Sequence, residues 1–93
     1  MERNIIVGRN LKLAREYLGL FRYQVAEILN IPHDTVTAYE EGELEVSNEM
    51  MEAFAKLYGV AATAFQHKHK EDMSKDERAI AEIIQWAKEI RQN

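Results

Sequence analysis

The amino-acid sequence predicts an all-α protein in which five short helices form one domain and an additional helix follows at the C-terminus. Three observations predict this fold class. Apolar residues recur at intervals of three and four along most of the chain, which is the period of an amphipathic helix. Glycine or asparagine follows four of these apolar stripes, at positions where helices commonly end. No stretch alternates apolar and polar residues convincingly enough to indicate a β-strand.

The first two predicted helices are each defined by one apolar face. In the first, the face consists of residues spaced four, three and four apart: Val7, Leu11, Ala14 and Leu18. Gly19 is its stop signal. The second helix is shorter, and its apolar residues share one face: Val25, Ala26 and Leu29. Asn30 can adopt the left-handed conformation that ends a helix, and Pro32 fits the first turn of the next one.

The third and fourth predicted helices are bounded by clear signals. The third places Val36 and Tyr39 inward, and Gly42 closes it. Ser47 caps the fourth, because a serine hydroxyl can accept a hydrogen bond from a free backbone amide of the first turn. Gly59 ends this helix, whose apolar stripe is Met51, Phe54, Ala55 and Tyr58.

The remaining residues predict three further features. "VAATAFQ" allows a short fifth helix that seats Phe65. The polar stretch after it lacks periodicity and is interpreted as a linker. Ser74 and Glu77 then form a capping box that opens a last helix. The chain is thus expected to have three parts: a domain over 1–66, a linker over 67–73 and an amphipathic helix over 74–93.

The last predicted helix has an apolar face too wide for a single shallow contact. One side is expected to dock on the domain, and the other to pair with a second copy of the chain. The residues expected to form this homodimer contact are Ile80, Ile83, Ile84, Trp86, Ala87 and Ile90. Two alternatives stay open: the helix completes the core of the monomer, or it docks on another protein such as a toxin.

Composition excludes several functions. The chain has no cysteine, which rules out disulfides, cysteine zinc sites and thiol catalysis, and it has no apolar run long enough to span a membrane. The N-terminus lacks the apolar core of a signal peptide, so a cytoplasmic protein is expected. His67 and His69 lack further metal ligands, and both serines are explained as helix caps. We therefore expect no enzyme activity, no cofactor and no metal.

Residues 22–39 match the pattern of a helix-turn-helix motif. With Arg22 as its first position, small Ala26 lies where two helices cross closely and Asn30 occupies the sharp turn. The apolar positions of the motif are Val25, Leu29, Ile31, Val36 and Tyr39. This pattern, together with "LKLAREYLGLFRYQVAEILNI", "TVTAYEEG" and "MMEAFAKLYGVAATAF", resembles the Cro/CI (XRE) family of phage and bacterial repressors over roughly residues 4–66. The resemblance implies a lambda-repressor-like domain of five helices.

The resemblance also implies a function and a set of residues for it. A protein of this family binds double-stranded DNA as a transcriptional regulator, commonly as a homodimer with its third helix in the major groove. The matching DNA-contact positions are Arg22 on the phosphate backbone and His33, Asp34, Thr35, Thr37 and Ala38 in the groove. Arg15 and Glu40 match a family ion pair that joins the first helix to the third.

Charge supports an alternative function. The net charge is −4, and residues 40–52 contain six glutamates and no cation. Glu41, Glu43 and Glu45 occupy a loop where repressors often place groups that contact phosphate, so they oppose DNA binding. The alternative is a protein-interaction module, such as an antitoxin or accessory subunit whose acidic loop binds a basic partner. Asp34 has a simpler role available too, since a carboxylate stabilises the first turn of a helix by opposing its dipole.

Overall fold

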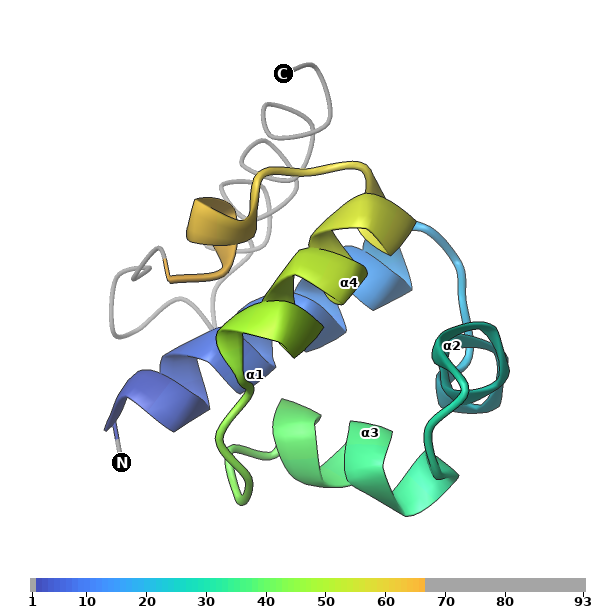
Figure 1. Cartoon of the computed structure of the whole chain (residues 1–93), viewed down its shortest axis with the longest axis horizontal. Coiled ribbons are helices and arrows are strands. Elements are labelled where there is room, and N and C mark those ends of the chain that lie inside the picture. Colours follow the sequence, from blue (N-terminus) through green and yellow to red (C-terminus); the bar gives the residue numbers. More distant parts are fainter. Residues whose placement is uncertain (1, 67–93) are drawn as a thin grey trace, which may run out of the picture.

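The computed structural model describes residues 2–66, which form four α-helices and one 3-10 helix with no strand among them (Figure 1). The helices are α1 (Glu2–Tyr17), α2 (Arg22–Leu29), α3 (His33–Glu40) and α4 (Asn48–Tyr58), followed by η1 (Ala62–Gln66). The prediction of an all-helical domain is confirmed for these residues. The predicted linker and C-terminal helix, residues 67–93, lie outside the described residues.

The predicted short fifth helix is a 3-10 helix, Ala62–Gln66, so residues 2–66 contain four α-helices and not five. A segment of five residues gains little from an α-helix, whose first bond spans five residues, whereas the tighter 3-10 helix closes its bonds one residue earlier. The amide of Ala64 accordingly donates to the carbonyl oxygen of Ala61. Phe65 is still seated as predicted and has no exposed surface.

The predicted helix ends at Asn30 and Ser47 are confirmed. Asn30 adopts the left-handed conformation, with φ 57° and ψ 47°, and lets the chain turn sharply from α2 into α3. Pro32 is the N-cap residue of α3, one position before the predicted first turn. The hydroxyl oxygen of Ser47 caps α4 by accepting from the amide of Met50 at 3.1 Å. These local signals set the lengths of the helices and the direction of the chain between them.

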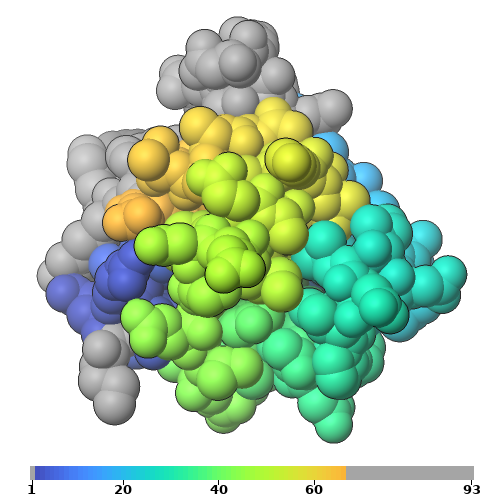
Figure 2. Space-filling model, in the orientation of Figure 1, coloured from blue at the N-terminus to red at the C-terminus, as the bar shows by residue number. Residues whose placement is uncertain are grey.

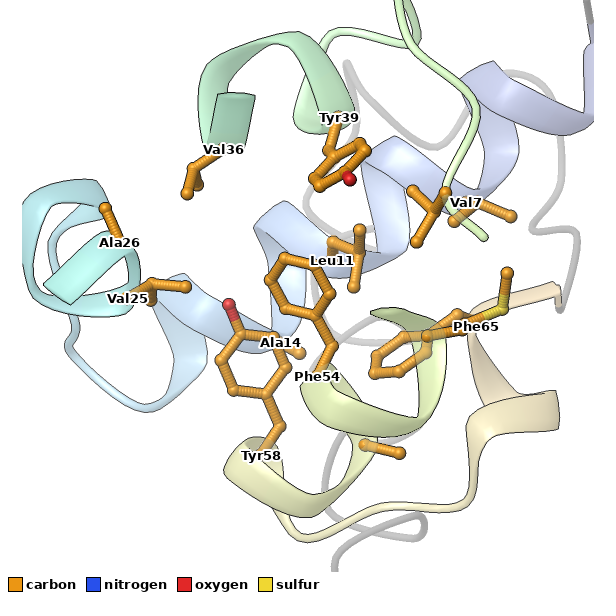
Figure 3. Close-up of a cluster of buried hydrophobic side chains, with 13 residues drawn as sticks. Val7, Leu11, Ala14, Val25, Ala26, Val36, Tyr39, Phe54, Tyr58 and Phe65 are labelled. Atoms are coloured by element: carbon orange, nitrogen blue, oxygen red, sulfur yellow. The ribbon is translucent and has the colours of Figure 1, made fainter. Parts of the chain in front are cut away.

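The core lies where α1, α3, α4 and η1 face one another (Figure 3). Aromatic rings run through it from α3 to η1: Tyr39 meets Phe54 with ring centroids 6.0 Å apart, and Tyr58 meets Phe65 at 6.2 Å. The buried apolar residues come from the predicted stripes and the segment after α4, joined by Val46 from the loop before α4: Val7, Leu11, Ala14, Val25, Ala26, Val36, Tyr39, Met51, Phe54, Ala55, Tyr58 and Phe65. Leu18 and Leu29 of the predicted stripes are only partly buried. This core holds α2 and α3 at one end of the molecule (Figure 1).

Two buried residues of α1 were not among the predicted core positions. Gly8 lies where α1 passes close to the end of α3, and a β carbon there would stand 2.7 Å from the carbonyl oxygen of Glu40. Asn10 is fully buried and donates from its Nδ2 to the carbonyl oxygen of Phe65 at 2.7 Å. Each residue carries a sequence signal: a glycine inside a helical pattern usually has a packing reason, and a buried amide needs a hydrogen-bond partner.

Candidate nucleic-acid interface

The first turn of α3 begins with two exposed residues. The side chain of His33 is 54% exposed and that of Asp34 is fully exposed. Thr35, Thr37 and Ala38 are each half-buried. The opposite face of the helix packs into the core through Val36 and Tyr39. The five groove positions implied by the resemblance therefore lie on the accessible part of α3, with its N-terminal turn outermost.

The polar groups on this surface differ in what they can offer a ligand. Thr37 donates its hydroxyl hydrogen to the carbonyl oxygen of His33, one turn earlier, at 3.3 Å. Its oxygen can still accept a hydrogen bond, but the donor is already used within the helix. The Nδ1 of His33 lies 3.9 Å from a carboxylate oxygen of Asp34, too far for a hydrogen bond. Both side chains remain available to base edges.

The Arg15–Glu40 pair implied by the resemblance is present and buried. Arg15 donates from Nε to one carboxylate oxygen of Glu40 at 2.7 Å and from Nη2 to the other at 3.1 Å, a bidentate contact. Its Nη1 donates to the carbonyl oxygen of Leu20 at 2.8 Å. Burial by itself would lower the pKa of Arg15, but the hydrogen bond and charge of Glu40 outweigh it and raise that pKa. The pair ties α1 to the last turn of α3 and to the segment before α2.

Arg22 lies at the start of α2, but it is not a free surface cation. Its Nε donates to Glu40 at 2.9 Å, and its side chain is only 26% exposed. Glu40, whose side chain is completely buried, thus joins two arginines from different elements. Glu16, which is half exposed, also lies 4.0 Å from Arg15 Nη2, so the two arginines face one buried and one exposed carboxylate. Sequence reasoning assigned Arg22 to the DNA backbone and did not detect its link to Glu40.

The hydroxyl of Tyr58 lies in the same part of the core. It is buried and has no hydrogen-bond partner among the described residues. In Figure 3 it points from α4 into the apolar cluster. Removal from water raises the pKa of Tyr58 well above its ordinary value, the negative charge of Glu40 raises it further, and Arg15 partly opposes the shift. Tyr58 therefore stays protonated in the folded protein under all ordinary conditions.

Carboxylates dominate the rest of this end of the molecule. Residues 21–47 contain one arginine, no lysine and six acidic residues. Glu41, Glu43 and Glu45 are all exposed in the loop after α3, which lies beside that helix (Figure 2). Arg3 reaches Glu45 at 3.5 Å, but both side chains are at least half exposed, so water weakens the pair. The loop therefore presents negative charge next to the groove positions, as the sequence predicted.

One exposed feature of α2 was not predicted. The rings of Phe21 and Tyr23 stack with centroids 5.7 Å apart and planes 10° apart, and both residues are about three-fifths exposed. They flank Arg22 in the sequence. Gln24 supports the same turn, because its Oε1 accepts from the amide of Phe21 at 2.8 Å. The sequence signal that could have indicated this exposed pair is the presence of two aromatic residues on either side of an arginine at the start of a helix.

Several predictions fall on residues that the structure does not describe. These are the proposed dimer residues of the C-terminal helix and the two histidines of the linker, all within residues 67–93. Among residues 2–66, no helix has both the length and the apolar character needed to cross a membrane. No group of three or more histidine, aspartate and glutamate side chains within that range is arranged to hold a metal ion.

Comparison with known proteins identifies the architecture. A family model described as "Helix-turn-helix domain" matches residues 6–67, about two thirds of the chain. Domains of this kind occur in Cro/CI-type regulators, so the resemblance drawn from the sequence is confirmed at this level. No curated protein and no solved structure matches the chain.

Proposed function

Because the chain belongs to the helix-turn-helix domain family, we propose that it is a DNA-binding transcription regulator of bacterial or phage type. In this proposal α3 enters the major groove of duplex DNA, as the second helix of such a motif does. The protein acts by binding rather than by catalysis, most simply as a repressor in the cytoplasm. His33 and Asp34 are the outermost groove residues, and Arg22 contacts the phosphate backbone.

One observation carries the proposal: α3 presents an accessible first turn while its last turn is tied to α1 by the buried Arg15–Glu40 pair. A reading helix has to be rigid relative to the rest of the domain, since a shift of its axis would move every groove contact together. The imidazole of His33 can donate to or accept from a base edge, and Asp34 can accept from a cytosine amino group. Neither forms the bidentate arginine–guanine contact, so we expect modest sequence discrimination.

We further propose that the regulator acts as a homodimer. Two-fold pairing places two recognition helices on half-sites one turn of DNA apart, which roughly doubles the binding free energy of one weak reader. The proposed contact uses the apolar residues of the C-terminal segment, with Ile83 and Trp86 at heptad spacing. Sedimentation of the full chain tests this: the wild type is expected to be a dimer at micromolar concentration, and Trp86→Ala with Ile83→Ala a monomer. A monomeric wild type contradicts dimerisation.

DNA binding is best tested without assuming an operator. Duplexes selected from a random pool by the full chain should share a short motif, and the selected duplex then serves for affinity measurements. Arg22→Ala is expected to weaken binding to every sequence and to reduce the salt slope by about one. His33→Ala is expected to change the preferred bases instead. Lys56→Ala is the matched control, since it removes an equal charge from an exposed position on α4.

Two results would contradict the proposed DNA binding or its geometry. If the wild type shows no affinity for any selected or random duplex at low ionic strength, it does not bind DNA. If Arg22→Ala and Lys56→Ala weaken binding equally, the docking of α3 described above is wrong even though DNA is bound.

A second function is favoured by the acidic loop. Glu41, Glu43 and Glu45 form an exposed anionic surface, and Leu44 between them is 44% exposed. A protein-interaction module, such as an antitoxin or accessory subunit, could use this surface to bind a basic partner. Chromatography on heparin or immobilised duplex at low ionic strength separates the two functions. A DNA-binding regulator is retained and elutes with salt, whereas a pure protein-binding module with this surface flows through.

A further inference from the structure

The carboxylate of Glu40 makes more contacts than an ion pair between α1 and α3 requires. Its Oε2 accepts from Arg15 Nε at 2.7 Å, and its Oε1 accepts both from Arg15 Nη2 at 3.1 Å and from Arg22 Nε at 2.9 Å. The bidentate contact with Arg15 is already complete without Arg22. The third hydrogen bond therefore has another consequence, which is to hold the Arg22 guanidinium in one place at the start of α2.

The way in which Arg22 is held leaves its outer edge available. Only Nε is bonded to Glu40; Nη1 and Nη2 have no hydrogen-bond partner within residues 2–66. These two nitrogens form the end of the guanidinium, and this end matches the spacing of two phosphate oxygens. Because Glu40 is fully buried while Arg22 is partly exposed, the anchored side of the guanidinium faces the protein. The remaining side can meet a ligand from outside.

We propose that Glu40 is a positioning residue for phosphate recognition: it fixes Arg22 through Nε so that Nη1 and Nη2 together receive one phosphate group of the DNA backbone. This inference rests on the proposed function. A free arginine side chain on the surface would lose much of its rotational freedom on binding phosphate. An arginine already held by a buried carboxylate has lost that freedom on folding, so less affinity is sacrificed when DNA binds.

Charge makes this positioning more consequential here than on a basic protein. Arg22 is the sole arginine or lysine among residues 21–47, which contain six acidic residues. A mobile cation in such surroundings would pair with the exposed carboxylates around it. Glu40 prevents this because it binds Nε in the interior, and Arg15 offsets the charge of Glu40 through its bidentate contact, so that Glu40 does not cancel the charge of Arg22 alone. The anionic loop can then coexist with one dependable phosphate contact.

The first test replaces the shape of the cation and keeps its charge. A lysine at position 22 has a single nitrogen, which cannot pair with Glu40 and also offer phosphate two donors in a fixed plane. In the full chain, Arg22→Lys is expected to bind the selected duplex about tenfold more weakly than wild type, close to Arg22→Ala. Thermal unfolding of each variant shows whether the domain is intact. If Arg22→Lys binds as tightly as the wild type, charge alone is sufficient and the inference is wrong.

The second test asks whether Glu40→Gln tightens or weakens DNA binding. Glu40→Gln removes a negative charge near DNA, so simple electrostatics predicts tighter binding. If Glu40 positions Arg22, Glu40→Gln should weaken DNA binding when Arg22 is present, and should not weaken it further in the Arg22→Ala variant. A gain of affinity in both backgrounds would overturn the inference. Glu40→Gln also loosens the contact with Arg15, so its DNA affinity is interpreted only if the variant unfolds cooperatively. If the variant does not fold, the affinity of Arg22→Lys decides.

A third measurement locates the phosphate. Duplexes carrying a neutral methylphosphonate at one backbone position at a time should reveal positions at which wild-type affinity falls. At one of these, Arg22→Ala and Arg22→Lys should lose most of the sensitivity while remaining sensitive elsewhere. A role of Arg22 in folding alone would not change the pattern along the backbone. Absence of such a position overturns this inference but leaves DNA binding intact, whereas a wild type that binds no duplex overturns both.

Discussion

Gly8 of α1 lies directly against the main chain of Glu40 at the end of α3. A β carbon at position 8 would stand 2.7 Å from the carbonyl oxygen of Glu40 and 2.9 Å from its carbonyl carbon, closer than real β carbons approach other atoms. The side chain of the same Glu40 binds Arg15, which is also on α1. Both the main chain and the side chain of this one residue therefore fix the recognition helix on the first helix.

Replacement of Gly8 by alanine is expected to destabilise the domain, although alanine is the better helix former by about 1 kcal/mol. The added methyl group would meet main-chain atoms, which cannot move aside as a flexible side chain can. We expect a net loss of about 1–3 kcal/mol in the free energy of unfolding, the usual cost of overpacking. Chemical denaturation measures it, with Arg9→Ala, at an exposed position next to it, as the control. Unchanged or increased stability would show that α1 can shift away from the end of α3 at little cost in free energy.

Replacement of Tyr58 by phenylalanine is expected to stabilise the domain. The tyrosine hydroxyl is buried without a hydrogen-bond partner among the described residues, and such a group costs about 1–3 kcal/mol. Phenylalanine keeps the ring, which contacts Phe54 and Phe65 at centroid distances of 5.7 and 6.2 Å. We expect a gain of about 1 kcal/mol, measured by denaturant unfolding. A loss of similar size would mean that the hydroxyl has a partner, such as an ordered water.

Alkaline pH should destabilise the wild type more than the Tyr58→Phe variant. Burial holds the pKa of Tyr58 above its ordinary value near 10 in the folded protein, so above pH 10 the unfolded chain releases this proton while the folded chain keeps it. Stability from this group is complete below pH 10 and falls as the pH rises beyond it. Unfolding midpoints between pH 8 and about 11 should therefore decline more steeply for the wild type. Parallel curves for the two proteins would contradict the assigned burial.

Neutralising the acidic loop should increase affinity for DNA. Glu43 is exposed after α3 and has no ion-pair partner within residues 2–66, so Glu43→Gln removes one repulsive charge without breaking a contact. We expect duplex binding to tighten by roughly two- to fivefold at low ionic strength, an effect that salt diminishes. Glu52→Gln, at an exposed position on α4, is the matched control and should change affinity less. Equal effects of the two substitutions would place the loop away from the duplex.

The sequence predicted some residues of the candidate site but not all of the contacts between them. The resemblance located His33 and Asp34 on the exposed first turn of α3, because a helix-turn-helix has a constant spacing between its turn and its reading helix. It also implied the Arg15–Glu40 pair. It did not reveal that Arg22 shares the same carboxylate, since that contact joins positions 18 residues apart and depends on the angle between two helices.

By itself, the sequence determined the helices and their ends: apolar periodicity, left-handed Asn30 and the Ser47 cap act within a few residues and need no distant partner. Tertiary structure alone decided which side chains share Glu40, why position 8 has no room for a β carbon, and that buried Asn10 donates to the carbonyl oxygen of Phe65. The physical reason is distance along the chain. Local hydrogen bonds are encoded by neighbouring residues, whereas buried charges and close helix contacts depend on how separate helices pack.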